Sequence, residues 1–203
     1  MKTNEKLIED LLTKLKRLNY IHTKDIPNID LYMDQVTTFM DQNLASVKRH
    51  DDDKVLTKTM INNYAKNDLL PPPVKKKYSR DHLILLAFIY YFKGFLSIGD
   101  IQVLLSPLSE KYFTEGHDRL DKIYDEIVQT EKAQLSKLLE DVESSFKLSK
   151  STFEDYPEED RDYLQLFSFI CMLSFDVYLK KQMIEQIIDE MRSSKEDDEK
   201  SGK

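Results

Sequence analysis

The chain is poor in the residues on which sheets and disulfide frameworks depend. Its 203 residues include only four Gly, six Pro and one Cys, and no Trp. Because hairpins need turn residues, this composition favours an all-α protein. A single cysteine excludes a disulfide framework and makes a thiolate metal cage implausible. Cys171 lies inside the apolar run LFSFICMLSF, so we expect a buried core thiol.

Other absences argue against further classes of protein. No apolar run approaches the ~20 residues of a membrane span, and the N-terminal segment is charged throughout, unlike a signal segment. We therefore expect a cytoplasmic protein with no membrane partner. The four histidines lack partners at metal-ligand spacing, and there is no glycine-rich phosphate loop or nucleophile elbow. We expect no enzymatic activity, no catalytic residue, no metal and no cofactor.

Charge is distributed unevenly along the chain. The net charge is −7, yet residues 54–93 hold eight Lys or Arg against two Asp, a local balance of +6. The remaining residues therefore carry −13. A basic segment within an otherwise acidic chain is typical of a segment that binds a polyanion.

Apolar periodicity predicts helices at residues 3–18, 30–44, 57–67, 80–92, 98–105, 118–146 and 158–192. Strand signal is confined to residues 74–78. Pro107 is expected to end the helix that begins at Ile98. These elements suggest an N-terminal helix and connector at 1–29, a domain at 30–106, a helical C-terminal domain at 107–192 and a disordered acidic tail at 193–203.

The predicted helix 57–67 has two distinct faces. Thr57 is a good N-cap, and Met60, Ile61 and Tyr64 form an inner face. The outer face is polar and consists of Lys58, Thr59, Asn62, Asn63 and Lys66. Three prolines at 71–73 forbid further helix, and a run of lysines follows at 75–77.

These residues resemble the winged helix-turn-helix DNA-binding domain of the MerR family of transcription regulators. Residues 61–72 (INNYAKNDLLPP) are similar to the family's I-R-Y-Y-E-x-x-G-L-L-x-P, and residues 76–79 (KKYS) to its R-x-Y-S. Residues 95–105 are similar to its G-F-S-L-x-E-I-x-x-L-L. The whole chain also resembles a bacterial family from low-GC Gram-positives, described only as a domain of unknown function.

The chain departs from the MerR pattern at several places. Asn62 stands where the family has an arginine that contacts the DNA backbone, and Asp68 stands where it has a turn glycine. The wing is several residues shorter. Residues 45–55 are inserted between the first and second helices of the motif, where the family has a tight turn.

The resemblance implies a DNA-binding transcription regulator whose recognition helix, about 57–67, enters the major groove of double-stranded DNA beside a basic wing at 74–80. Its DNA-binding residues would be Lys58, Thr59, Asn62, Asn63, Lys66, Lys75, Lys76, Lys77, Tyr78 and Arg80. The alternative is a non-enzymatic protein-interaction module that keeps the fold without binding DNA. The sequence identifies no effector.

The long helix at 118–146 has two alternative roles. It resembles the MerR helix that dimerises as an antiparallel coiled coil, so a homodimer through 118–146 is one expectation. The other is that it packs on the apolar last helix of its own chain, where the pair would enclose a small effector or simply form a core.

Overall fold

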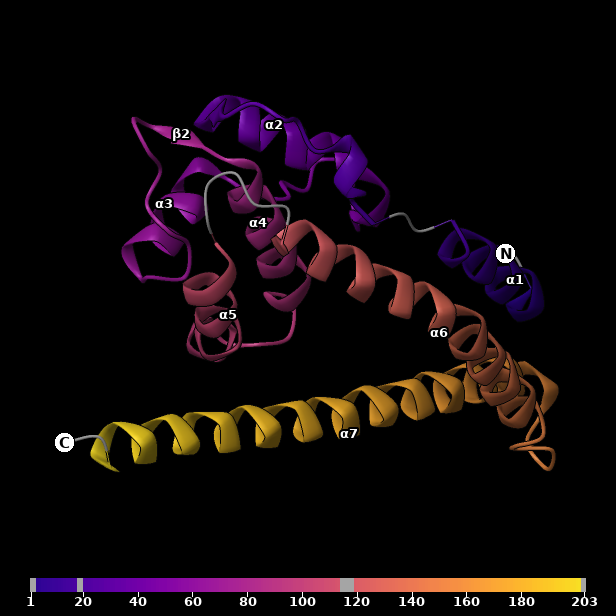
Figure 1. The fold of residues 1–203 in the computed structure, drawn as a ribbon. Coiled ribbons are helices and arrows are strands. Elements are labelled where there is room, and N and C mark those ends of the chain that lie inside the picture. The colour runs from indigo at the N-terminus through magenta and orange to yellow at the C-terminus, as the bar shows by residue number, and fades with distance from the viewer. Residues whose placement is uncertain (1–2, 18–19, 114–118, 202–203) are drawn as a thin grey trace. The chain divides into compact units, whose positions relative to one another are not determined.

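The computed structural model describes residues 3–17, 20–113 and 119–201, with side chains as far as 195. The described residues are mostly helical, which confirms the expected all-α class (Figure 1). The α-helices are α1 (Asn4–Leu15), α2 (Met33–Asn43), α3 (Lys58–Lys66), α4 (Arg80–Phe92), α5 (Ile98–Tyr112), α6 (Arg119–Lys150) and α7 (Glu158–Ser201). Two short strands, β1 (Leu31–Tyr32) and β2 (Lys77–Tyr78), form a two-stranded sheet.

Contacts divide the chain into two compact units. Unit 1 combines Met1–Leu18 with Gln129–Ile184, and unit 2 combines Asn19–Val128 with Glu185–Lys203. The two long helices α6 and α7 each contribute residues to both units. The sequence predicts domains that follow one another along the chain, whereas these two units are each made of two separate segments.

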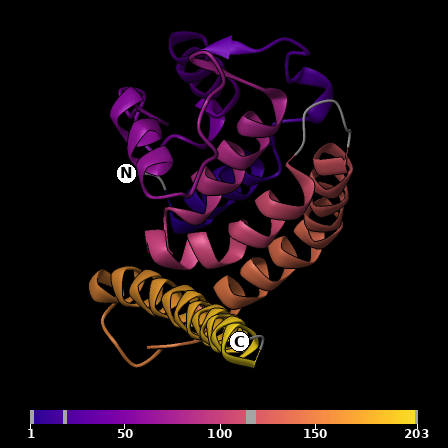
Figure 2. The same cartoon turned by 60° about the vertical axis from the view of Figure 1, so that its left-hand side comes forward.

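The core of unit 2 is built around α4. This helix is apolar nearly all round, and every residue from Asp81 to Ile89 is buried. Figure 2 shows α4 in the middle of this unit. Phe88 packs edge-on against Tyr124 of α6, with ring centroids 5.2 Å apart, and α5 contributes the buried side chains of Ile101 and Leu105. Burial on all sides explains the helix's lack of a polar face.

The sheet joins the entry of α2 to the exit of the lysine run. Leu31 pairs with Tyr78 and Tyr32 with Lys77 in antiparallel register. Sequence periodicity does not identify β1, because two residues are too few to show alternation. α2 begins directly after β1, with Tyr32 at the N-cap, where its backbone N–H donates to Gln35 Oε1 at 2.9 Å.

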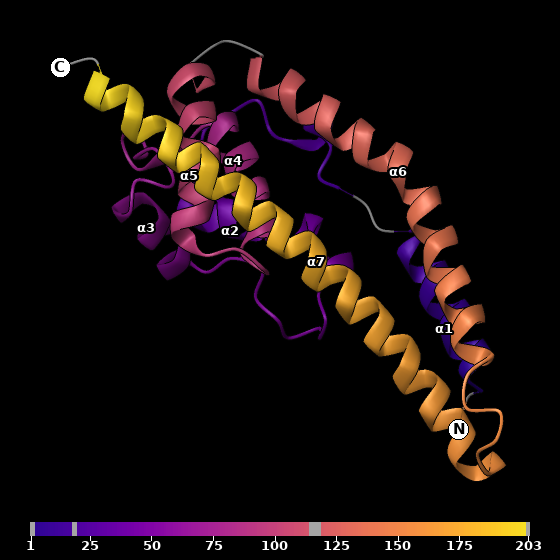
Figure 3. The same cartoon turned by 90° about the horizontal axis from the view of Figure 1, so that it is seen from below.

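Unit 1 has a smaller core between α1, α6 and α7, and Figure 3 shows α1 lying along α6. Ile8, Phe146 and Phe169 are buried together there. Glu5 and Lys150 form an ion pair at 2.7 Å. Gln165 is buried and donates its amide to the carbonyl oxygens of Lys150 and Thr152, at 2.8 and 3.0 Å. These bonds fix the connection between α6 and α7.

Three expectations from sequence are corrected here. Pro107 lies inside α5, which continues to Tyr112. An interior proline costs a helix about 3 kcal/mol, and the burial of Ile101 and Leu105 offsets this cost. Cys171 is exposed, since Phe169 occupies the face of α7 that packs in unit 1. α7 continues to Ser201, into the segment whose composition predicts disorder.

Within the described residues, one helix is long and apolar enough to cross a membrane by length and composition. It is the segment Glu158–Lys195 of α7, and 11% of its most apolar 18-residue window is buried. Helices of soluble proteins also reach this length and apolar composition, so the property is weak evidence for a membrane span. It nevertheless marks α7 as carrying an unusual exposed apolar surface.

Candidate nucleic-acid interface

Helix α3 is fixed at both ends by local chemistry. The Thr57 hydroxyl accepts from the Met60 N–H at 3.2 Å and caps the first turn. Asp68 adopts a φ of 53° after the last turn, a conformation that Asn and Asp tolerate better than most residues. The backbone N–H groups of Leu69 and Leu70 then donate to the Tyr64 carbonyl oxygen. The expected helix is thus confirmed with ends shifted by one residue.

The inner and outer faces of α3 lie as the sequence predicts. Ile61 and Tyr64 are buried, and burial raises the pKa of the Tyr64 hydroxyl. All five outward residues are exposed: Lys58, Thr59, Asn62, Asn63 and Lys66. Within the described chain, no protein group lies within hydrogen-bonding distance of the side-chain amides of Asn62 and Asn63. These two amides are therefore available for external partners.

One of the outward cations already has a partner. The Lys58 ammonium forms an ion pair with Asp34 of α2. Both side chains are more than half exposed, so water screens the attraction and the pair contributes little to stability. A phosphate group would therefore compete with Asp34 for Lys58 at low energetic cost.

The lysine run forms a two-residue turn. The Lys77 N–H donates to the Val74 carbonyl oxygen at 2.9 Å, and Val74 pairs with Lys77 in an isolated bridge. Between them Lys75 and Lys76 have φ angles of 51° and 66°. Positive φ at both central residues defines the type I′ hairpin turn, which normally selects Asn-Gly or Gly-Gly. Each lysine is held there at a cost of about 1–2 kcal/mol.

The turn presents its charges to solvent. Lys75 and Lys76 are exposed. The Lys77 ammonium lies 5.2 Å from the centre of the Tyr32 ring, a cation–π contact on the surface of the sheet. In the view of Figure 1, α3 and the turn before β2 lie on the same side of unit 2.

Two of the ten residues expected to bind DNA make contacts within their own chain instead: Tyr78 is buried, and Arg80 is partly exposed. Tyr78 is 3% exposed, and burial raises the pKa of its hydroxyl. Arg80 Nε donates to both carboxylate oxygens of Asp121, while its two Nη atoms donate to the carbonyl oxygens of Ile26 and Thr23. The Arg80 guanidinium is thus engaged by groups of its own chain.

The structure also gathers cations that sequence reasoning missed. A shallow cavity of about 490 Å³ lies between the inserted residues 45–55 and the end of α4, and Arg49, Lys54 and Lys93 line it. The Lys93 ammonium donates to the Val55 carbonyl oxygen at 2.6 Å, and burial lowers the pKa of this side chain. Lys48 lines the same cavity but is paired with Asp41 at 2.7 Å. The positive charge of residues 54–93 includes Lys54 and Lys93. The sequence does not show that these two lysines line one cavity with Arg49, because that depends on the fold.

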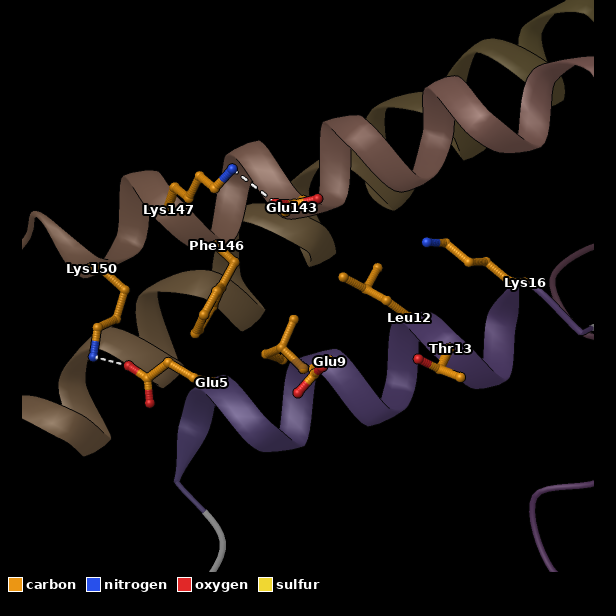
Figure 4. A pocket seen from close by; sticks show the side chains of 10 residues that line it. Glu5, Glu9, Leu12, Thr13, Lys16, Glu143, Phe146, Lys147 and Lys150 are labelled. Carbon is orange, nitrogen blue, oxygen red and sulfur yellow. Dashed lines mark ion pairs between the residues drawn. The ribbon is translucent and has the colours of Figure 1, made fainter.

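Unit 1 has a separate cavity of about 650 Å³ between α1 and α6 (Figure 4). Its apolar wall includes Leu12 and Phe146. The charges at its rim largely neutralise one another, since Lys150 pairs with Glu5 and Lys147 pairs with Glu143. This cavity therefore offers apolar volume with little net charge.

No group of three or more His, Cys, Asp or Glu side chains within the described residues is placed to hold a metal ion.

The model of one protein family, "Domain of unknown function (DUF1836)", matches residues 21–127, which is more than half of the chain. The chain belongs to this DUF1836 family. No curated protein and no solved structure matches the chain.

The matched DUF1836 segment has nearly the same limits as the first segment of unit 2, Asn19–Val128. It contains α2 to α5, the sheet, the inserted residues 45–55 and the first part of α6. The α3 face and the Lys75–Lys76 turn are therefore features of the DUF1836 segment, whereas α7 lies outside it.

Proposed function

We propose that unit 2 binds double-stranded DNA as a winged helix-turn-helix similar to that of the MerR family, and that the protein is a transcription regulator. Helix α3 would be the recognition helix, preceded in the motif by α2. The turn at Lys75 and Lys76 would be the wing. This assignment makes the protein a binding protein without enzymatic activity.

The observation that carries the proposal is the backbone of Lys75 and Lys76. Two consecutive lysines occupy left-handed conformations at the tip of a two-residue turn, where glycine or asparagine would be more stable. Conformational strain of this kind persists mainly where function requires it. Two ammonium groups projected from a hairpin tip are suited to contact phosphates, which position a protein on DNA.

The α3 surface supports the same function by different chemistry. A helix of nine residues fits the major groove, which admits a helix and displays a distinct pattern of donors and acceptors for each base pair. Asn62 and Asn63 carry side-chain amides, which pair bidentately with adenine. Lys66 lies on the same exposed face and would contact a phosphate.

The burial of Tyr78 and the internal hydrogen bonds of Arg80 exclude these two residues from the proposed DNA interface. Their side chains hold unit 2 together, so the proposal assigns phosphate contact to Lys66, Lys75, Lys76 and Lys77. Four neutralised phosphates correspond to a slope of about −4 in a plot of log affinity against log salt concentration. Arg49 and Lys54 of the inserted segment would add to this slope if DNA extends over the basic cavity.

A titration of duplex DNA by fluorescence anisotropy at several salt concentrations tests the proposal. The protein should bind a mixed-sequence duplex at low salt with a slope of about −4. A Lys75→Ala/Lys76→Ala variant should weaken binding and reduce the magnitude of the slope by about 2. A Lys14→Ala/Lys137→Ala variant removes two exposed lysines of unit 1 and should leave binding unchanged. Absence of binding at low salt, or equal effects of both variants, would contradict the proposal.

The second candidate function is a protein-interaction module that keeps this fold without binding DNA. The engagement of Arg80 by Asp121 and of Lys58 by Asp34 favours it, because each contact removes a cation from the basic surface. A folded protein that fails to bind DNA at low salt would support this alternative.

A further inference from the structure

Helix α7 carries a row of exposed side chains with regular spacing. The row, named here the α7 seam, consists of Tyr163, Phe167, Ile170, Ser174 and Val177. The four large side chains are all at least half exposed, from 51% for Ile170 to 68% for Tyr163. So much contiguous apolar surface is unusual on a monomer and marks an interaction site.

The spacing of the α7 seam is that of a coiled coil. Its members follow one another at intervals of four, three, four and three residues, the a/d pattern that keeps one stripe of a helix facing a partner helix. The seam spans about 21 Å of helix at 1.5 Å per residue. Ser174 contributes a small side chain to the row.

The opposite charges at the two ends of the α7 seam favour an antiparallel pair of α7 helices over a parallel pair. Residues 158–162 (EEDRD) carry a net charge of −3, while Lys180 and Lys181 follow the seam at its other end. An antiparallel pair of α7 helices centred near Ile170 places the acidic end of each copy beside the lysines of the other. A parallel pair would instead place like charges together, which is destabilising.

The face of α7 next to the seam argues against a membrane as the surface that covers the α7 seam. Phe169 is one residue from Ile170 and is buried with Ile8 and Phe146. Gln165 is also buried in the same helix, with its amide bonded to two carbonyl oxygens. A helix that spans the bilayer would have to abandon this packing and expose Gln165 and Asp176 to lipid, which is costly.

The exposed apolar surface of helix α6 is less continuous than that of α7. Leu120, Tyr124 and Val128 of α6 are buried within unit 2, and Phe146 belongs to the core of unit 1. Much of the apolar stripe expected to dimerise through residues 118–146 is thus already used inside the chain.

We propose that the α7 seam is covered by the α7 seam of a second copy of this chain, in an antiparallel, two-fold symmetric pair. Such an interface is self-complementary, because each seam presents the same apolar row and the same two charged ends. The inference goes beyond DNA binding and does not depend on it.

Sedimentation equilibrium of the full-length chain tests the association. The wild type should have twice the 24.0 kDa of one chain. Ile170→Glu would place a carboxylate at the centre of the seam and should weaken dimerisation by at least about 100-fold. Leu179→Glu is the matched control, because Leu179 is 50% exposed and nine residues from Ile170 lies on the opposite side of the helix.

Circular dichroism should show the same helicity for both variants, since neither residue is buried within its own chain. A wild type that is monomeric at tens of micromolar would overturn the proposal. A dimer that is lost equally in Ile170→Glu and Leu179→Glu would also overturn it.

The orientation is tested with spin labels on the full chain. In a Cys171→Ser/Gln182→Cys background the only thiol lies 12 residues from Ile170. An antiparallel pair separates the two labelled backbones by about 36 Å along the helix axis, whereas a parallel pair brings them to about 10 Å. A dipolar distance near 10 Å would overturn the antiparallel arrangement.

Sedimentation with phosphatidylcholine–phosphatidylglycerol vesicles completes the test. The dimer should remain in the supernatant. A monomeric protein that sediments with the vesicles, and loses this property in Ile170→Glu, would overturn the second copy as occupant and assign the seam to a lipid surface.

Discussion

Arg80 and Asp121 form an ion pair that joins the first turn of α4 to the first turn of α6. Nε of Arg80 donates to the two carboxylate oxygens at 3.0 and 2.7 Å. The side chains are only 23% and 16% exposed, so water screens the attraction weakly. Because the same guanidinium also binds the segment Thr23–Ile26, the pair connects three parts of unit 2.

Removal of the carboxylate should destabilise unit 2. We expect Asp121→Ala to lower the free energy of unfolding by about 2–3 kcal/mol, because it leaves the half-buried guanidinium without its anion. Urea denaturation followed by circular dichroism measures the change. Asp141→Ala removes an exposed carboxylate of α6 and should cost less than about 0.5 kcal/mol. Equal decreases in the free energy of unfolding for the two variants would show that the Arg80–Asp121 ion pair stabilises unit 2 no more than an exposed carboxylate does.

The Lys75–Lys76 turn permits a test that separates strain from charge. Replacement by Asn-Gly, the preferred sequence for a type I′ turn, should raise the free energy of unfolding by about 1 kcal/mol. The same variant loses two cations and should bind DNA more weakly, with a salt slope reduced by about 2. Thermal melting and the anisotropy titration measure the two effects.

A glutamine pair is the control for this turn. Lys75→Gln/Lys76→Gln removes the charges but retains the unfavourable backbone, so it should weaken DNA binding without stabilising the fold. If Asn-Gly stabilised the protein while DNA affinity stayed the same, the strained lysines would have no role in binding DNA.

The outward face of α3 predicts a difference between base and phosphate contacts. After selection of a preferred duplex from random sequences, Asn63→Ala should reduce the preference for that duplex by about 1–3 kcal/mol. Lys66→Ala should instead weaken binding to preferred and scrambled duplexes alike. Competition titrations with both duplexes measure these changes. A uniform loss in Asn63→Ala would contradict its assignment as a base-reading residue.

The sequence predicts α3, α4 and the outward face of α3 because these depend on local periodicity and on caps such as Thr57. It does not predict contacts between distant segments. β1 is recognisable only from its pairing with β2, and the partner of Arg80 lies 41 residues away. Likewise, the apolar run around Cys171 suggests burial, yet one side of α7 packs in unit 1 while the α7 seam is exposed.

His82 connects the segment that leaves α3 to the start of α4. Its Nδ1 accepts from the Ser79 N–H at 2.9 Å, and its Nε2 lies 3.2 Å from the Pro71 carbonyl oxygen. This geometry fits a neutral ring with the proton on Nε2. The ring also contacts Tyr78 and Phe113 edge-on.

Burial lowers the pKa of His82 from its ordinary value of 6.5, although hydrogen bonds to the carbonyl oxygens of Pro71 and Pro72 and the charge of Asp30 oppose the shift. As pH falls below 6.5, the unfolded chain binds a proton that the folded chain does not, so the free energy of unfolding should decrease until the folded pKa is reached. Urea midpoints measured between pH 7.5 and 5 should fall for the wild type. His50→Gln, an exposed control, should behave like the wild type, while His82→Gln should show a smaller decrease from a lower starting stability. If the decrease were as large in His82→Gln as in the wild type, the acid sensitivity would belong to other groups.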